Sequence, residues 1–122
     1  MKESNKEEYN KLCAEFLGAV EYVPKAWYYF SRYRRHWFFP SRFEPNRFTT
    51  KMLRFDSDWN WIMEVVEKIE QLGFDVNIFE HDATIKKGSE YVVVTHASKI
   101  KTKKEAVVQA IWKFLNWYKK NK

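Results

Sequence analysis

The sequence predicts a single α+β domain over residues 1–122, in which about three helices cover a mostly antiparallel sheet. Three stretches carry apolar residues at the three- and four-residue spacing of amphipathic helices, and the segments between them are strand-like. Of the 122 residues, 45% are hydrophobic, whereas only 3 are glycine and 3 are proline. This composition is typical of one folded core without linkers or low-complexity tracts.

The first predicted helix runs from Ser4 to Gly18. Ser4 and Glu7 match the capping box that begins many helices, and glycine is the residue type that most often ends them. A short apolar stretch, Val20–Val23, follows. The apolar face of the helix consists of Tyr9, Leu12, Cys13, Phe16 and Leu17.

Residues 25–55 are predicted to form a long aromatic hairpin or lasso. This stretch contains 11 of the 23 aromatic residues of the chain. The run Trp27–Phe39 has strand propensity, Pro40 and Pro45 mark turns, and Phe48–Phe55 is expected to return as a second strand.

The most regular pattern lies between Asp56 and Gly73 and predicts the second helix. The segment starts with Asp56, Ser57 and Asp58, whose oxygen-bearing side chains suit a helix N-terminus, and it ends at a glycine. Its apolar stripe must pack on a sheet or on another helix. The stripe contains Trp59, Ile62, Met63, Val65, Val66, Ile69 and Leu72.

Three short strands and a third helix complete the predicted fold. Thr102 and Glu105 form a capping box at the start of the helix, and lysines near its end suit the negative end of its dipole. Turn residues separate the strands, which predicts an antiparallel meander. The strands are Phe74–Phe79, Ala83–Lys87 and Tyr91–Thr95.

Positive charge is concentrated in the aromatic segment. The whole chain has 22 Lys and Arg against 16 Asp and Glu, a net charge of +6. Between Lys25 and Phe55, eight basic residues stand against Glu44 alone, a net charge of +7, so the rest of the chain is close to neutral. Such a local excess favours a polyanionic partner.

Arginine and aromatic residues alternate closely in this segment, which indicates a binding surface. Guanidinium groups neutralise phosphates and flat rings stack on bases, so we expect nucleic acid as the ligand. The same residue types are enriched in protein interfaces, which leaves a homo-oligomer, a host protein or a small nucleotide-like anion as alternatives. The predicted contact residues are Arg32, Arg34, Arg35, Arg42, Arg47, Trp27, Tyr29, Tyr33 and Trp37.

No motif in the sequence predicts catalysis, so we expect a protein that is not an enzyme and uses neither a metal nor a cofactor. The few glycines are scattered and form no phosphate loop, and the three histidines lack metal-ligand spacing. Cys13 is the only cysteine, which excludes a disulfide within the chain. With no signal-peptide pattern or membrane-spanning run, the sequence favours a cytoplasmic protein without membrane contact.

Part of the chain resembles small uncharacterised proteins of Bacteroides-type phages and prophages. The motifs that carry the resemblance are LRFDSDWNWIMEVVEKIEQLG at Leu53–Gly73, then FDVNI, and KFLNWYKKN near the C-terminus, with AEFLG at Ala14–Gly18 upstream. More distantly, the order of elements is similar to the phage ABA sandwich domain. The resemblance implies an α+β fold and a bacterial host cytoplasm, and it carries no catalytic residues. It does not extend to residues 25–50.

Overall fold

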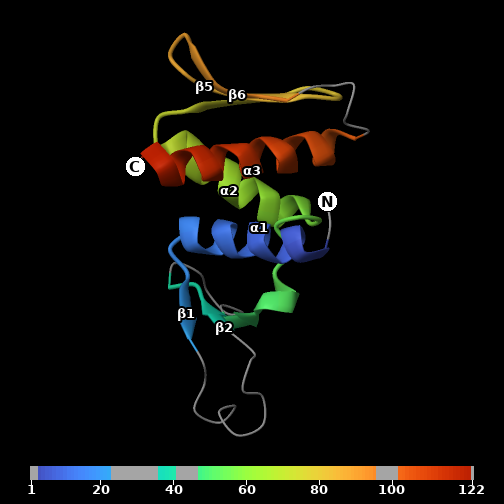
Figure 1. Ribbon diagram of the computed structural model, residues 1–122, viewed down its shortest axis with the longest axis vertical. Coiled ribbons are helices and arrows are strands. Elements are labelled where there is room, and N and C mark those ends of the chain that lie inside the picture. The colour runs from blue at the N-terminus through green and yellow to red at the C-terminus, as the bar shows by residue number, and fades with distance from the viewer. Residues whose placement is uncertain (1–2, 23–35, 41–46, 96–101, 122) are drawn as a thin grey trace, which may run out of the picture. The chain divides into compact units, whose positions relative to one another are not determined.

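The computed structural model describes residues 3–22, 36–40, 47–95 and 102–121 (Figure 1). It divides into two compact units, Met1–Arg54 and Phe55–Lys122. The described residues form three α-helices and two antiparallel three-stranded sheets. The predicted α+β class is therefore confirmed, with the strands divided between two sheets instead of gathered in one.

The first unit begins with helix α1, Glu3–Phe16. Gly18 ends it with a φ of 84°, and its amide donates to the carbonyl of Glu15, as expected for a glycine terminator. The helix begins at Glu3, so Ser4, which the sequence predicted at its start, lies in its first turn. Tyr9, Cys13 and Ala14 of this helix are buried.

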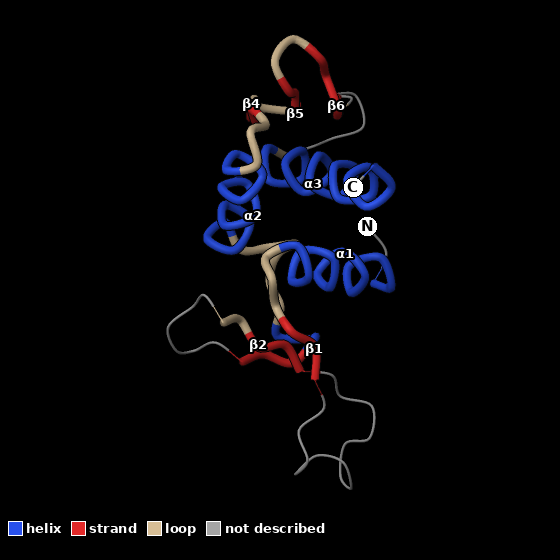
Figure 2. The backbone as a smooth tube through the Cα atoms, turned by 90° about the vertical axis from the view of Figure 1, so that its left-hand side faces the viewer, coloured by secondary structure: helices blue, strands red, loops and turns tan. Residues whose placement is uncertain are grey.

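Three short strands form the sheet of the first unit in the order β1-β2-β3, and Figure 2 shows β1 and β2 side by side. They are β1 Val20–Tyr22, β2 His36–Phe38 and β3 Arg47–Thr49. The pairing of β2 with β3 provides two strands of the predicted aromatic hairpin, while most of the run Trp27–Phe39 lies outside the described residues.

The expected return strand over Phe48–Phe55 is wrong beyond Thr49. A 3₁₀ helix, η2 (Thr50–Met52), replaces it, and the amide of Leu53 donates to the carbonyl of Thr50. The amide of Leu53 therefore bonds within a local 3₁₀ turn instead of bonding to a neighbouring strand of the sheet. Within the same unit, η2 packs against α1.

Helix α2, Trp59–Gln71, opens the second unit where the sequence predicted it. Asp58 is its N-cap, and one of its carboxylate oxygens accepts a hydrogen bond of 2.9 Å from the amide of Asn60. Gly73 follows the helix with a φ of 97°. Four residues of the predicted stripe are buried, namely Ile62, Val65, Val66 and Ile69.

The predicted meander and third helix are also present. The strands β4 Asp75–Ile78, β5 Ala83–Lys87 and β6 Glu90–Val94 pair in that order, and α3 spans Lys103–Asn121. The hydroxyl of Thr102 accepts a hydrogen bond of 3.1 Å from the amide of Glu105, as the capping box requires. Figures 1 and 2 show α2 and α3 on the same side of this sheet.

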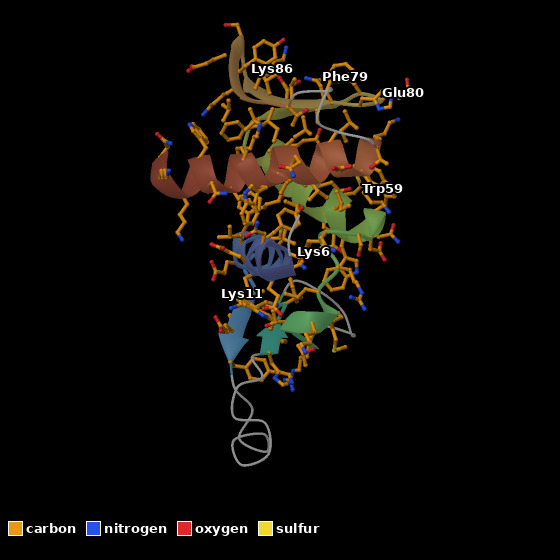
Figure 3. All side chains as sticks on the ribbon, turned by 45° about the vertical axis from the view of Figure 1, so that its right-hand side comes forward. Lys6, Lys11, Trp59, Phe79, Glu80 and Lys86 are labelled. Atoms are coloured by element: carbon orange, nitrogen blue, oxygen red, sulfur yellow. The ribbon has the colours of Figure 1, made fainter. Side chains whose placement is uncertain are left out.

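No described element of the second unit covers the opposite face of the β4–β6 sheet. Phe79, Tyr91 and Val94 are 52%, 59% and 49% exposed. Figure 3 shows Phe79 and Lys86 on the side of the sheet away from α3. Beneath the sheet, the core of this unit is continuous from Ile85 to α3, where Val107, Ile111 and Phe114 are fully buried.

Candidate nucleic-acid interface

Two of the predicted contact residues, Trp37 and Arg47, lie on described strands of the first unit. The others fall within residues 23–35 and 41–46, outside the described residues: Arg32, Arg34, Arg35, Arg42, Trp27, Tyr29 and Tyr33.

Trp37 is a core residue and not the surface residue that the sequence predicted. Its side chain has no exposed area, and its indole N–H donates a hydrogen bond of 3.0 Å to the hydroxyl of Thr50. On the neighbouring strand it pairs with Phe48, which is also buried. A ring enclosed in this way has no free face for a base, so its function is to hold the sheet on the core.

The strand register shows which side chains lie on the face of the sheet opposite Trp37. Side chains alternate between the two faces along a strand, and directly paired residues share a face. Two rows of paired residues lie on the face opposite Trp37. One row is Val20, Phe38 and Arg47, and the other is Tyr22, His36 and Thr49. We call these six residues the β1–β3 outer face.

Aromatic rings and a cation are in contact on the β1–β3 outer face. The guanidinium carbon of Arg47 lies 5.5 Å from the centre of the Phe38 ring. The rings of Tyr22 and His36 are 5.6 Å apart at an interplanar angle of 43°. All three rings are half-buried, whereas Arg47 is exposed. The face therefore offers π surface and positive charge together.

Two further exposed cations, Lys51 and Arg54, follow β3 along the chain. The guanidinium of Arg54 donates a hydrogen bond of 3.3 Å to the carbonyl of Lys51. Among the described residues, no carboxylate pairs with Arg47, Lys51 or Arg54.

Sequence reasoning missed the contribution of β1. Val20 and Tyr22 belong to the outer face because β1 pairs with β2, yet the sequence only marked Val20–Val23 as a short apolar stretch. The alternation of Val20, Glu21 and Tyr22 was a signal for a strand. Nothing in three residues, however, indicates which partner strand they pair with.

Cys13 is buried, and Asp58 caps α2. His81 is exposed, and its Nε2 lies 3.8 Å from the carboxylate of Glu80, which is still more exposed. In the described part of the chain, no three His, Cys, Asp or Glu residues are grouped as metal ligands.

A search of the described helices finds none with the length and apolar character needed to cross a membrane.

Comparison with protein-family models, with curated proteins and with solved structures finds no match for this chain. The resemblance to phage proteins and to the phage ABA sandwich domain stays a prediction.

Proposed function

We propose that this chain is a non-catalytic, phage-type protein that binds nucleic acid through its basic aromatic segment, residues 25–54. The observation that carries the proposal is the β1–β3 outer face, where the exposed Arg47 lies against the ring of Phe38, and two more exposed cations follow it along the chain. The phage context and the cytoplasm of a bacterial host are parts of the proposal that rest on the sequence resemblance.

Two physical effects support nucleic acid as the ligand. Each phosphate that meets a Lys or Arg side chain releases condensed counterions, which favours binding at low salt. Each base that stacks on an aromatic ring contributes about 1–3 kcal/mol. The segment combines both, because its net charge of +7 is interleaved with aromatic residues.

The contact between Arg47 and Phe38 does not prevent a base from stacking there. A cation over a ring at an exposed site is worth about 0.5–1 kcal/mol, less than the ~1–3 kcal/mol of a stacked base. A base that displaces Arg47 from the ring therefore gains free energy, and the displaced guanidinium remains close enough to meet a phosphate.

A protein–protein interface is the second candidate function. Val20 and Met52, at 54% and 49% exposure, place apolar area close to the cations of the first unit. Aromatic residues, Met and Arg are enriched at protein interfaces. The partner would be a second copy of the chain or a host factor such as a defence component. A small nucleotide-like anion held between Arg47 and a ring is the third candidate.

Salt dependence separates nucleic acid from a protein partner, and a triple variant locates the contact. We expect Arg47→Gln with Lys51→Gln and Arg54→Gln to weaken binding of labelled single-stranded DNA and RNA. If each cation meets one phosphate, the slope of log affinity against log salt should become shallower by about 2, because each contact adds ~0.7. Fluorescence anisotropy at several salt concentrations measures both quantities.

The matched control removes the same charge from the second unit. Lys103→Gln with Lys113→Gln and Lys120→Gln changes three exposed lysines of α3 and leaves the net charge equal to that of the first variant. We expect its salt slope to stay within about 0.5 of the unmodified protein, since it loses no phosphate contact. Equal losses in both variants would indicate non-specific attraction, and no binding at low salt would reject the proposed function.

A further inference from the structure

We infer that two copies of this chain pair through the outer edge of β4, so that their β4–β6 sheets join into one continuous antiparallel sheet. The observation behind this inference is the edge itself. β4 ends the strand order of its sheet, and no described strand lies on its outer side. The inference concerns an interaction surface of the second unit and does not depend on nucleic-acid binding by the first.

The backbone groups of Val76 and Ile78 point out of this edge. Where β4 turns into β5, the amide of Phe79 donates a hydrogen bond of 2.8 Å to the carbonyl of Asp82. Hydrogen-bonded and non-hydrogen-bonded pairs alternate along an antiparallel ladder. Counted from that bond along the register, Val76 and Ile78 occupy non-hydrogen-bonded positions. Their N–H and C=O groups therefore point away from β5, towards the outer side of β4.

The side chains of the same two residues leave the core incomplete at this edge. Val76 pairs with Ile85 and Ile78 pairs with Ala83, and paired residues share a face of the sheet. Ile85 and Ala83 are fully buried, whereas Val76 and Ile78 are only half-buried. A further strand beside β4 would cover the apolar area that the edge leaves open, which favours association.

β4 lacks the features that usually prevent an edge strand from pairing. Bulges, prolines and lysines are common protections of such edges. The other edge strand of this sheet, β6, has a register shift where it pairs with Ile85 and Lys86. β4 contains neither proline nor lysine, and its pairing with β5 is regular over all its residues. It is therefore the edge of this sheet that is suited to accept another strand.

A second copy of β4 fits this edge. With Asn77 opposite itself on a two-fold axis, Val76 of each copy pairs with Ile78 of the other, as a self-complementary interface requires. Both residues then exchange hydrogen bonds through their outward-pointing backbone groups. Their apolar side chains stay on the buried face of the joined sheet. A shift of one residue would bring them opposite side chains of the other face, so the register is defined.

Charge favours the same antiparallel arrangement. Glu80, in the turn after β4, is 87% exposed. Lys87 lies beside the start of β4, with Nζ 5.4 Å from the centre of the Phe74 ring, and no carboxylate among the described residues pairs with it. Figure 3 shows Glu80 and Lys86, the neighbour of Lys87, towards opposite ends of the sheet. Antiparallel pairing thus brings the Glu80 turn of each copy to the Lys87 end of the other.

Cysteine cross-linking tests the register. Asn77 faces itself at a non-hydrogen-bonded position, where Cα atoms are ~4.5 Å apart, within the range of a disulfide. We expect Asn77→Cys to form a disulfide-linked dimer under mild oxidation, seen on a non-reducing gel. The matched control is Thr84→Cys, because Thr84 pairs with Asn77 on β5 and lies one strand further from the axis. It should not cross-link, and equal cross-linking of both variants would overturn the inference.

A charge swap at the same position provides a second test. Asn77→Lys and Asn77→Asp each place like charges opposite one another, so each should weaken dimerisation about fivefold in sedimentation equilibrium. An equal mixture of the two variants should regain the affinity of the unmodified chain. Thr84→Lys, which adds the same charge away from the axis, should dimerise normally. Circular dichroism checks that each variant folds.

The unmodified full chain, without nucleic acid, should show twice the mass of one copy by size-exclusion chromatography with light scattering. A single-copy mass at the highest soluble concentration would overturn the inference. A dimer that neither cross-links through Asn77→Cys nor responds to the charge swap would also overturn it, because the contact would then lie elsewhere. These measurements contain no nucleic acid, so their failure and that of the proposed function are distinguishable.

Discussion

At the scale of single residues, burial decides which aromatic side chains of the basic segment can meet a ligand. Trp37 and Phe38 are neighbours in the sequence and have the same chemical character, yet Trp37 is fully buried and Phe38 is half-exposed. The alternation of a strand produces this difference, because successive side chains point to opposite faces. Residue type therefore leads to the proposed binding segment, and the strand register decides which of its described side chains are exposed.

We predict that Trp37 is required for stability and not for binding. Trp37→Ala should lower the free energy of unfolding by about 3–5 kcal/mol, as for a large aromatic removed from a core. Trp37→Phe should cost less, because it keeps an aromatic ring and loses the hydrogen bond to Thr50, worth about 0.5–1.5 kcal/mol. Urea denaturation followed by circular dichroism measures these values.

The exposed Phe79 is the control for this prediction. Phe79→Ala should change the free energy of unfolding by no more than about 0.5 kcal/mol, as is usual for surface positions. If Trp37→Phe folds normally but loses nucleic-acid binding at unchanged stability, then Trp37 is a contact residue and its assignment to the core is incomplete.

At the scale of secondary-structure elements, the helices of the second unit depend on local signals at their ends. Asp58 accepts the amide of Asn60 at the start of α2, and Thr102 accepts the amide of Glu105 at the start of α3. Each bond satisfies one of the amide groups that the first turn of a helix leaves without a partner. The start of each of these two helices could be predicted from the sequence, because a capping hydrogen bond joins residues that are only a few positions apart.

We predict that the carboxylate of Asp58 acts as a cap and not as an acid or base. Asp58→Ala should lower the free energy of unfolding by about 1 kcal/mol. Asp58→Asn should be close to neutral, since the amide oxygen accepts the same hydrogen bond and asparagine caps as well as aspartate does. Thermal and urea denaturation of the three proteins provide the comparison.

A different result for the asparagine variant would contradict this assignment. If Asp58→Asn destabilised the chain as much as Asp58→Ala, the negative charge and not the hydrogen bond would be the stabilising feature, through the dipole of α2.

At the scale of the whole molecule, charge and exposed rings are distributed unequally between the two units. Met1–Arg54 contains eleven basic and six acidic residues, a net charge of +5, whereas Phe55–Lys122 contains eleven basic and ten acidic residues, a net charge of +1. Both units expose aromatic rings on a sheet, but only the first combines them with a charge excess. We therefore expect the proposed nucleic-acid binding to be a property of the first unit.

We predict that a bound single strand protects only the first unit from hydrogen exchange. Amides of Val20–Tyr22, His36–Phe38 and Arg47–Thr49 should exchange more slowly in the complex, while those of Asp75–Ile78 and Glu90–Val94 should be unchanged. The reason is that a ligand over a strand restricts local opening of its hydrogen bonds. Hydrogen exchange with mass spectrometry on the full chain, with and without an oligonucleotide, measures this pattern.

Protection of the β4–β6 sheet alone would contradict the assignment and would move the binding surface to Phe79, Tyr91 and Val94. A duplex of the same length, added at the same salt concentration, is the reference for non-specific attraction.

The sequence by itself determined the α+β class, the positions of the helices and of the β4–β6 meander, and the place where positive charge and aromatic residues gather. These properties follow from periodicity, end signals and composition, which act over short distances along the chain. Gly18 and Gly73, for example, end their helices at positive φ as predicted.

Only the tertiary structure decided how the strands pair and which side chains they bury. β1 pairs with β2 although a long stretch of chain separates them, and this pairing places Tyr22 beside His36. The strands β1–β3 thus form a sheet of their own, separate from β4–β6. A shift of one residue in that register would exchange the two faces, exposing Trp37 and burying Phe38. Long-range pairing and core packing select the register, so a local pattern in the sequence locates the proposed binding segment without identifying its exposed face.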